Sequence, residues 1–230
     1  MIQGQIYTRI YKGFSIGSTV LLEAPSLNLL VNLIDTELEK KPRLLEGRST
    51  LKTITLRETG PAVLKTYLRG GWTSRFNRKH YVRCGKTRSQ RELEFISHAR
   101  NAGVKAPIPI AYITRGKAVY QAWLVTEAII PHTTFAALSL SHPQNAIDLL
   151  PEVSQNISLL VDARIYHVDL HPGNILITPN DGIHIVDFDK AHFFCGNRKN
   201  LIRKYKKRWT KATTKYGFHK SLSTIIPQSA

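Results

Sequence analysis

The feature that most constrains this chain is a pair of polar segments set on either side of two short apolar runs. Residues 167–174 read HVDLHPGN, and residues 187–190 read DFDK. Between them, the apolar runs 175–177 and 183–186 are separated by a Pro-Asn-Asp-Gly turn, which predicts a β-hairpin. The two polar segments therefore flank a predicted hairpin.

The residue types in these segments are those that phosphoryl transfer requires. They match the pattern H-x-D-x-x-x-x-N followed by D-F-x, which is typical of kinase catalytic loops and metal-binding motifs. One carboxylate must orient the attacking hydroxyl and accept its proton, and hard oxygen ligands must hold the Mg²⁺ ions that neutralise the triphosphate. Asp169 suits the first task, and Asn174 and Asp187 suit the second. The pattern predicts ATP and Mg²⁺ as cofactors.

Two upstream segments extend the pattern. Residues 63–72, VLKTYLRGGW, are similar to the strand-lysine segment of the lipopolysaccharide kinase family and the Arg-Gly-Gly that follows it. Residues 91–96, RELEFI, resemble the helix that carries the glutamate partner of that lysine. The family's magnesium motif reads Asp-Phe-Asp and then a basic residue, as residues 187–190 do. Over residues 45–209 the chain therefore resembles this family, and most of all its kinases of 3-deoxy-D-manno-octulosonic acid (Kdo).

The resemblance implies roles for residues in the first half of the chain. Lys65 would hold the phosphates of ATP, and Glu92 would hold Lys65. Independently of the family, protein-kinase folds use a strand lysine and a helical glutamate to position the triphosphate. Glu94 is an alternative partner for the lysine, and Gly47, in a reduced glycine-rich loop at residues 46–49, would help to cover the phosphates.

The resemblance also implies the reaction. The protein would phosphorylate a Kdo sugar, by resemblance at its 4-hydroxyl, and its partner would be Kdo-lipid A or inner-core lipopolysaccharide. A heptose kinase of the same family, a small atypical protein kinase and an aminoglycoside-type phosphotransferase are the alternatives. The short stretch after Asp187 favours a compact, non-protein acceptor. Val168 replaces the arginine of regulated protein kinases, which predicts constitutive activity, while Asp189 is open as a metal ligand, a sugar contact or a cap.

Two readings outside the kinases compete with this one. In a metal-dependent hydrolase, His167, Asp169, His171 and Asp187 would gather a transition metal, but Lys65 would then have no task. In a pseudokinase, the basic tracts would bind an anionic membrane or RNA without catalysis. The presence of Lys65 together with the full polar pattern disfavours both readings.

The hydrophobic periodicity predicts α+β organisation. The resemblance implies a protein-kinase-like fold with two lobes and an ATP cleft between them. The first lobe, residues 1–127, would hold a small antiparallel sheet and one helix, and the second, residues 128–230, would be mainly helical. Strands are expected at 51–56, 62–67, 108–114 and 119–127, and helices at 89–101 and 151–164, with a Gly60-Pro61 turn before the second strand. The apolar patch 27–34 could be either a helix or a strand.

The net charge of +17 bears on partners. Residues 65–91 carry nine Lys/Arg and residues 190–230 carry eleven, and neither tract contains an acidic residue. In the predicted helix 200–209, an apolar stripe could rest on an anionic membrane surface or pack on the second lobe. We expect no nucleic acid and no obligate protein partner. The chain shows no signal peptide or apolar run of about 18 residues, which predicts a soluble or peripheral protein. The resemblance implies a peripheral position at the cytoplasmic face of the bacterial inner membrane.

Overall fold

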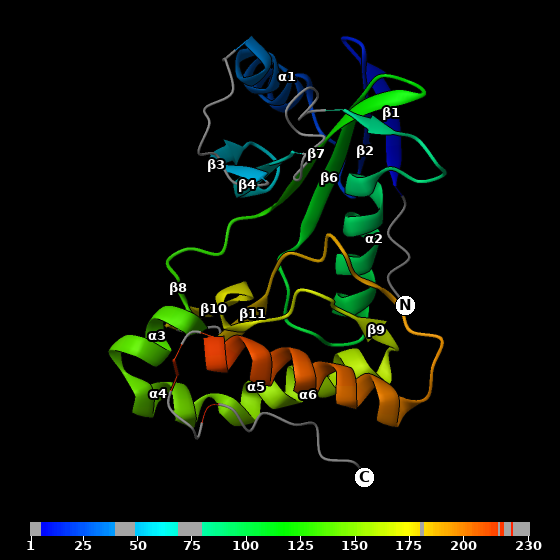
Figure 1. The fold of residues 1–230 in the computed structure, drawn as a ribbon. Helices are drawn as coiled ribbons and strands as arrows, with labels where there is room; N and C mark the ends of the chain where they lie inside the picture. The colour runs from blue at the N-terminus through cyan, green and yellow to red at the C-terminus, as the bar shows by residue number, and fades with distance from the viewer. Residues whose placement is uncertain are drawn as a thin grey trace. The chain divides into compact units, whose positions relative to one another are not determined.

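The computed structural model describes residues 6–39, 49–68, 80–179, 182–215, 217–218 and 222 (Figure 1). The chain divides into two compact units. One comprises Met1–Leu93 and Ile108–Ala128, and the other comprises Glu94–Pro107 and Ile129–Ala230. The predicted assignment of nucleotide binding to residues 1–127 and of catalysis to residues 128–230 stays a prediction.

An antiparallel sheet forms the framework of the first unit. Its strands are β1 (Tyr7–Tyr11), β2 (Phe14–Ser18), β3 (Ser49–Leu56), β4 (Gly60–Tyr67), β5 (Tyr81–Val82), β6 (Pro109–Arg115) and β7 (Val119–Glu127). The order is β1-β2-β6-β7-β4-β3, with β5 paired to β7. Lys65 lies opposite Leu51 of β3 and Leu124 of β7, so it occupies a strand with a neighbour on each side. The predicted β3–β4 hairpin is confirmed, but its turn is Arg57–Thr59, and Gly60 and Pro61 belong to β4.

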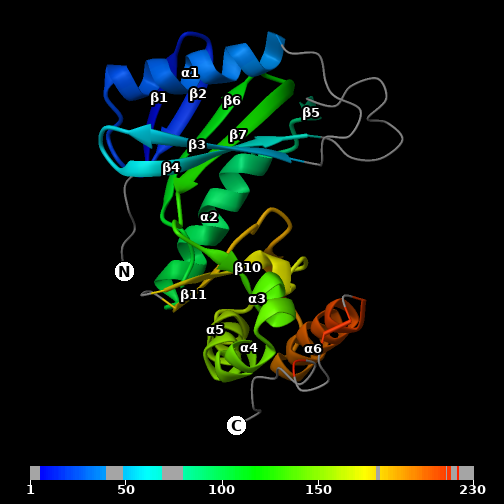
Figure 2. The ribbon, with the colours of Figure 1, turned by 90° about the vertical axis from the view of Figure 1, so that its left-hand side faces the viewer.

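Helix α1 (Ala24–Glu39) covers one face of this sheet, as Figure 2 shows. Its buried side chains recur at helical spacing: Leu27, Leu30, Val31 and Ile34. They share a core with Ala62 and Leu64 of β4. The apolar patch 27–34 is therefore part of a helix, and the first unit contains this helix in addition to the one expected.

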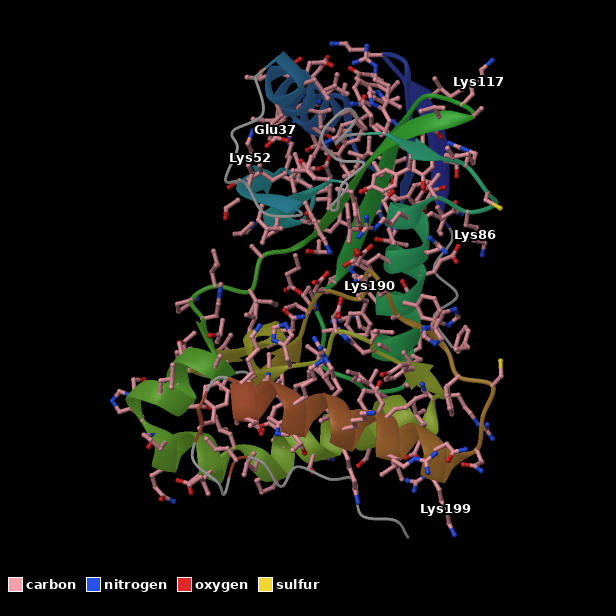
Figure 3. The ribbon with its side chains drawn as sticks, viewed as in Figure 1. Glu37, Lys52, Lys86, Lys117, Lys190 and Lys199 are labelled. Carbon is pink, nitrogen blue, oxygen red and sulfur yellow. The ribbon has the colours of Figure 1, made fainter. Side chains whose placement is uncertain are left out.

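The polar side of α1 also contacts the sheet. Glu37 forms an ion pair of 2.9 Å with Lys52 of β3 and accepts a hydrogen bond of 2.7 Å from the hydroxyl of Thr66 on β4 (Figure 3). These contacts involve the same face of β4 as the apolar core, because Ala62, Leu64 and Thr66 alternate along the strand. The odd-numbered residues Val63 and Lys65 are consequently directed to the opposite face.

Helix α2 (Arg88–Asn101) agrees with the expected helix 89–101. Thr87 begins it, since its hydroxyl accepts a bond of 3.4 Å from the Gln90 amide. The boundary between the two units falls within α2, after Leu93, so that Glu92 belongs to the first unit.

The second unit is mainly helical. Its helices are α3 (Phe135–Ser141), α4 (Pro143–Asp148), α5 (Leu150–Asp162) and α6 (Arg198–Lys215), with a short 3-10 helix, η2, at Pro172–Asn174. Its short strands are β8 (Thr133–Thr134), β9 (Ile165–Tyr166), β10 (Ile175–Thr178), β11 (Gly182–Ile185) and β12 (His192–Phe193). Strands β10 and β11 form the predicted hairpin, with Ile175 opposite Ile185, and β8 extends it to three strands. The expected α+β class is confirmed.

Helix α6 is longer than the predicted helix 200–209, and its apolar stripe lies inside the second unit. Leu201, Ile202, Tyr205 and Trp209 are all buried, and the Trp209 indole packs edge-on against Phe135. Of the two interpretations of this stripe, packing on the second unit is the one observed. In the described residues, no helix combines the length and the apolar character needed to cross a membrane.

Candidate active site

A buried ion pair joins Lys65 to Glu92 within the first unit. The Lys65 Nζ lies 2.8 Å from Oε1 and 3.0 Å from Oε2 of Glu92. The Glu92 side chain is 2% exposed and that of Lys65 is 13% exposed. A charge buried to this degree requires a partner, and each residue supplies it for the other. Of the two glutamates considered from the sequence, Glu92 is the one that pairs with the lysine.

Tyr67 supports this ion pair, and sequence reasoning missed it. Its buried hydroxyl donates a hydrogen bond to Glu92 Oε2, and Lys65 Nζ lies 5.1 Å from its ring centroid. The Arg88 guanidinium lies over the same ring at 5.2 Å. A sequence signal did exist, because residues two apart on a strand share a face and Tyr67 follows Lys65 by two.

The loop of residues 167–174 in the second unit is anchored through His167. The Nε2 atom of His167 lies 3.0 Å from the Val186 carbonyl oxygen, and its ring packs edge-on against Phe188 at 4.7 Å. Burial lowers the pKa of His167, so the ring is neutral, and it must carry its proton on Nε2 to donate to a carbonyl. The His167 ring therefore binds the backbone next to Asp187 and has a structural role.

The β10–β11 hairpin brings Asn174 and Asp187 to the same end of the strands. Ile175 pairs with Ile185, and just beyond this pair the Val186 amide donates to the Asn174 carbonyl at 3.0 Å. The Asn174 side-chain NH₂ donates a hydrogen bond of 3.0 Å to the Asp169 backbone carbonyl, and the Asn174 Oδ1 can serve as a metal ligand. Asp187 has a φ of 66°, which is a left-handed backbone conformation. Asp adopts this conformation more often than most residues do, and residues held in it cluster at functional sites.

Two cations hold the carboxylate of Asp169. Lys190 Nζ lies 2.7 Å from Oδ2, and Arg208 Nη2 lies 3.5 Å from Oδ1. Sequence reasoning missed both contacts. Lys190 was visible as the basic residue of the DFDK motif, but Arg208 comes from α6, and no local pattern relates the two segments.

His171 lies beside the same carboxylate. Its Nδ1 accepts a 3.0 Å bond from the Gly173 amide, which closes the turn that begins η2. Burial, and then the positive charge of Arg208, lower the pKa of the half-buried His171. Its ring therefore stays neutral at physiological pH, and the positive charges beside Asp169 are those of Lys190 and Arg208.

The structure thus groups the predicted site residues in two sets. Lys65 and Glu92 meet in the first unit, while Asp169, Asn174 and Asp187 gather around one loop and hairpin in the second. Gly47 lies outside the described residues.

The second set could hold a magnesium ion but does not resemble a transition-metal site. Asn174 and Asp187 supply amide and carboxylate oxygens, which suit Mg²⁺, and nucleotide phosphates and water usually complete its coordination. No group of three or more His, Cys, Asp or Glu is arranged to hold a metal in the described ranges. The Nε2 of His167 is engaged by a carbonyl. These observations disfavour the hydrolase reading.

Comparison with known proteins identifies relatives over most of the chain. The model of the lipopolysaccharide kinase (Kdo/WaaP) family matches residues 39–216. The chain is 31% identical to the 3-deoxy-D-manno-octulosonic acid kinase of Vibrio cholerae, over 78% of this chain and 77% of that protein. It is 32% identical to the enzyme of the same name from Vibrio vulnificus strain YJ016, over 75% of each chain.

A solved structure also aligns with this one. It is a MAP kinase from Leishmania major, with 20% sequence identity and a TM-score of 0.47 over 73% of this chain and 51% of that one. The assignment to a family rests on the family match and on the site residues, which follow one another along the chain in the order that the family motifs predict. The chain belongs to the lipopolysaccharide kinase (Kdo/WaaP) family and is a phosphotransferase.

Proposed function

We propose that this protein transfers the γ-phosphate of ATP, with Mg²⁺, to a hydroxyl of Kdo in the lipopolysaccharide inner core, and that the hydroxyl is the one at position 4. The observation that carries the proposal is the arrangement around the β10–β11 hairpin. It brings one amide oxygen and one carboxylate to the same end of the strands, beside the loop that bears Asp169.

Asp169 is the base in this proposal. The acceptor O–H gives its proton to the Asp169 carboxylate while its oxygen forms a bond to the γ-phosphorus. The bond from that phosphorus to the bridging oxygen breaks, and ADP leaves with the electron pair. The side-chain amide of Asn174, bound to the Asp169 carbonyl, fixes the backbone that carries the base.

Asn174 and Asp187 would hold the metal, and Lys65 would hold the nucleotide phosphates. When bound, Mg²⁺ neutralises charge that develops on the phosphate oxygens. Glu92, together with the Tyr67 hydroxyl, keeps the Lys65 ammonium in one position, so that little rotamer freedom remains to be lost on binding ATP. Lys65 and Glu92 are thus positioned before the nucleotide arrives.

Kdo is proposed as the acceptor because two Vibrio relatives are named as Kdo kinases. The chain covers at least three quarters of the length of each. A direct test is to supply purified protein, labelled ATP and Mg²⁺ with Kdo-lipid A, with a heptosylated acceptor and with a generic protein substrate. We expect label in the Kdo-lipid, and NMR of the product should place the phosphate on the 4-hydroxyl. Label found in the protein substrate or exclusively in heptose would overturn the acceptor assignment.

A further inference from the structure

The two cations that bind Asp169 are placed where an acceptor must arrive. Lys190 contacts one oxygen of this carboxylate and Arg208 contacts the other. A base accepts a proton from a hydroxyl within hydrogen-bond distance of the carboxylate. An acceptor hydroxyl seated on Asp169 would therefore lie beside one or both cations, and the atoms next to that hydroxyl would meet them.

Arg208 has hydrogen-bonding capacity that its contact with Asp169 does not use. That contact is long, at 3.5 Å, and the side chain is 32% exposed. Its Nε is buried and has no hydrogen-bond partner among the residues described in the structure, so a ligand would meet the exposed remainder of the guanidinium side chain. A guanidinium offers five donors in a rigid fork, and a carboxylate is the group that this fork matches best.

The surroundings of Arg208 favour a negatively charged ligand. Burial raises the pKa of Tyr166, and the positive charge of Arg208 partly opposes that rise. Lys204, one turn earlier on α6, lies over the Tyr166 ring at 5.2 Å. Lys190 and Arg208 together place two positive charges beside the single carboxylate of Asp169, and an anionic group of the acceptor would balance the excess positive charge.

We propose that Arg208, assisted by Lys190, binds the carboxylate of the acceptor sugar and so selects a sugar acid over a neutral sugar. This inference rests on the proposed function, in which the acceptor is Kdo, an acid that carries its carboxylate on the same ring as its hydroxyls. The cations contact Asp169, which receives the hydroxyl. Both cations lie at the carboxylate that meets the acceptor. An acceptor contact therefore fits better than a phosphate contact.

The test pairs a change in the protein with a change in the acceptor. Kdo-lipid A and its Kdo methyl ester, which lacks the negative charge, are supplied in detergent micelles to the wild type and to Arg208→Gln. Charge-assisted hydrogen bonds predict that esterification lowers wild-type kcat/KM by about 10- to 100-fold. Arg208→Gln should lower kcat/KM on the acid by a similar factor, mostly through KM for the acceptor, with KM for ATP unchanged.

The decisive result is that the effect of Arg208→Gln and the effect of esterifying the acceptor are not additive. Arg208→Gln should cost less than about threefold on the ester, because the interaction it removes is already lost. Arg208→Lys, which keeps the charge but not the fork, should recover part of the activity on the acid. Arg203→Gln is the matched control: it lies on the same helix, is exposed, and bonds Asn200 within that helix.

The outcomes separate this inference from the function on which it rests. Equal losses on acid and ester, or a raised KM for ATP, would place Arg208 with the phosphate or with the fold and overturn the inference while leaving the kinase intact. Wild-type protein that phosphorylates neither acceptor would contradict the proposed function and the inference together. If Arg208→Gln fails to fold, Lys190→Met, on a side chain that is 47% exposed, carries the same comparison.

Discussion

At the scale of single residues, the buried charge of Glu92 is the strongest constraint in the first unit. Two donors, the Lys65 ammonium and the Tyr67 hydroxyl, converge on a carboxylate that is almost fully buried. Removing one charge from such a pair costs more than the pair itself contributes, because the remaining charge stays buried without compensation. The pair is therefore expected to hold local structure as well as to orient the lysine.

We predict that Glu92→Gln lowers the free energy of unfolding by about 3 kcal/mol, the lower part of the range for breaking a buried ion pair. Chemical denaturation followed by circular dichroism measures it. Arg91→Gln, at an exposed neighbouring position, is the control and should change stability by less than about 0.5 kcal/mol. Equal stability of the two variants would show that the ion pair contributes little to folding.

His167 makes stability depend on pH. Because burial lowers its pKa in the folded protein, the unfolded chain binds a proton below about pH 6.5 that the folded protein does not. Stability from this residue is thus fully present above the unfolded pKa and is lost as pH falls below it, by at most about 1.4 kcal/mol per pH unit.

His167→Gln retains an amide donor but does not titrate, and it should flatten the stability profile between pH 5 and about pH 7. His142→Gln, at an exposed position, serves as the control and should keep the wild-type profile. If the wild type and His167→Gln show parallel profiles, His167 is not the titrating group.

At the scale of elements, α6 connects the loop that bears Asp169 to the core of the second unit. The Tyr205 hydroxyl accepts a 2.8 Å bond from the His167 amide and donates a 2.7 Å bond to the Ile165 carbonyl. One side chain thus satisfies two buried backbone groups on both sides of Tyr166. The same helix supplies Arg208 to Asp169, so its apolar face holds the loop in place and its polar face contacts the proposed base.

We expect Tyr205→Phe to lower the free energy of unfolding by about 1–3 kcal/mol, because two buried backbone groups lose their partner. It should also lower kcat, since the backbone before Asp169 loses its support. Tyr7→Phe, on an exposed tyrosine of β1, provides the comparison. Unchanged stability together with unchanged kcat would mean that the loop keeps its conformation without α6.

The burial of the apolar stripe changes how α6 would meet a membrane. With Leu201, Ile202, Tyr205 and Trp209 buried, insertion of this stripe is not available, whereas Lys206 and Lys207 are exposed. We propose that any attraction to an anionic surface is electrostatic.

The double variant Lys206→Gln/Lys207→Gln should bind anionic vesicles about 10- to 30-fold more weakly, since each surface cation contributes about 1 kcal/mol. Vesicle co-sedimentation at low and high salt measures this. Lys86→Gln/Lys117→Gln removes the same charge from exposed positions of the first unit, both labelled in Figure 3. Equal weakening by both pairs would assign the attraction to net charge, and no weakening by the α6 pair would exclude this helix.

The elements differ in how far local sequence predicted them. Strand β7 and helix α2 agree with expectation because their apolar periodicity is complete within each segment. The patch 27–34 was ambiguous because eight residues are too few to separate the two periods, and the 16-residue α1 resolves it. The fate of the α6 stripe could not be decided, because burial depends on a partner surface formed by distant residues such as Phe135.

At the scale of the whole molecule, the site residues that were predicted are those written in local motifs. Asp169, Asn174 and Asp187 are separated by one loop and one hairpin, so the spacing of the sequence encodes their proximity. Tyr205 and Arg208 lie 38 and 39 residues from their partners, and long-range contacts of this kind leave no periodic trace. Family membership supplied the class of reaction, and the structure supplied the cations around the base.

The central claim is that this protein is a kinase that phosphorylates Kdo and that Asp169 is its catalytic base. Its most direct test is mass spectrometry of Kdo-lipid A after incubation with ATP, Mg²⁺ and either the wild type or Asp169→Asn. The wild type should add the mass of one phosphate group to the Kdo portion, and Asp169→Asn should do so at least about 100-fold more slowly. A Kdo-lipid of unchanged mass after incubation with folded wild-type protein, or an Asp169→Asn variant as fast as the wild type, would contradict the account.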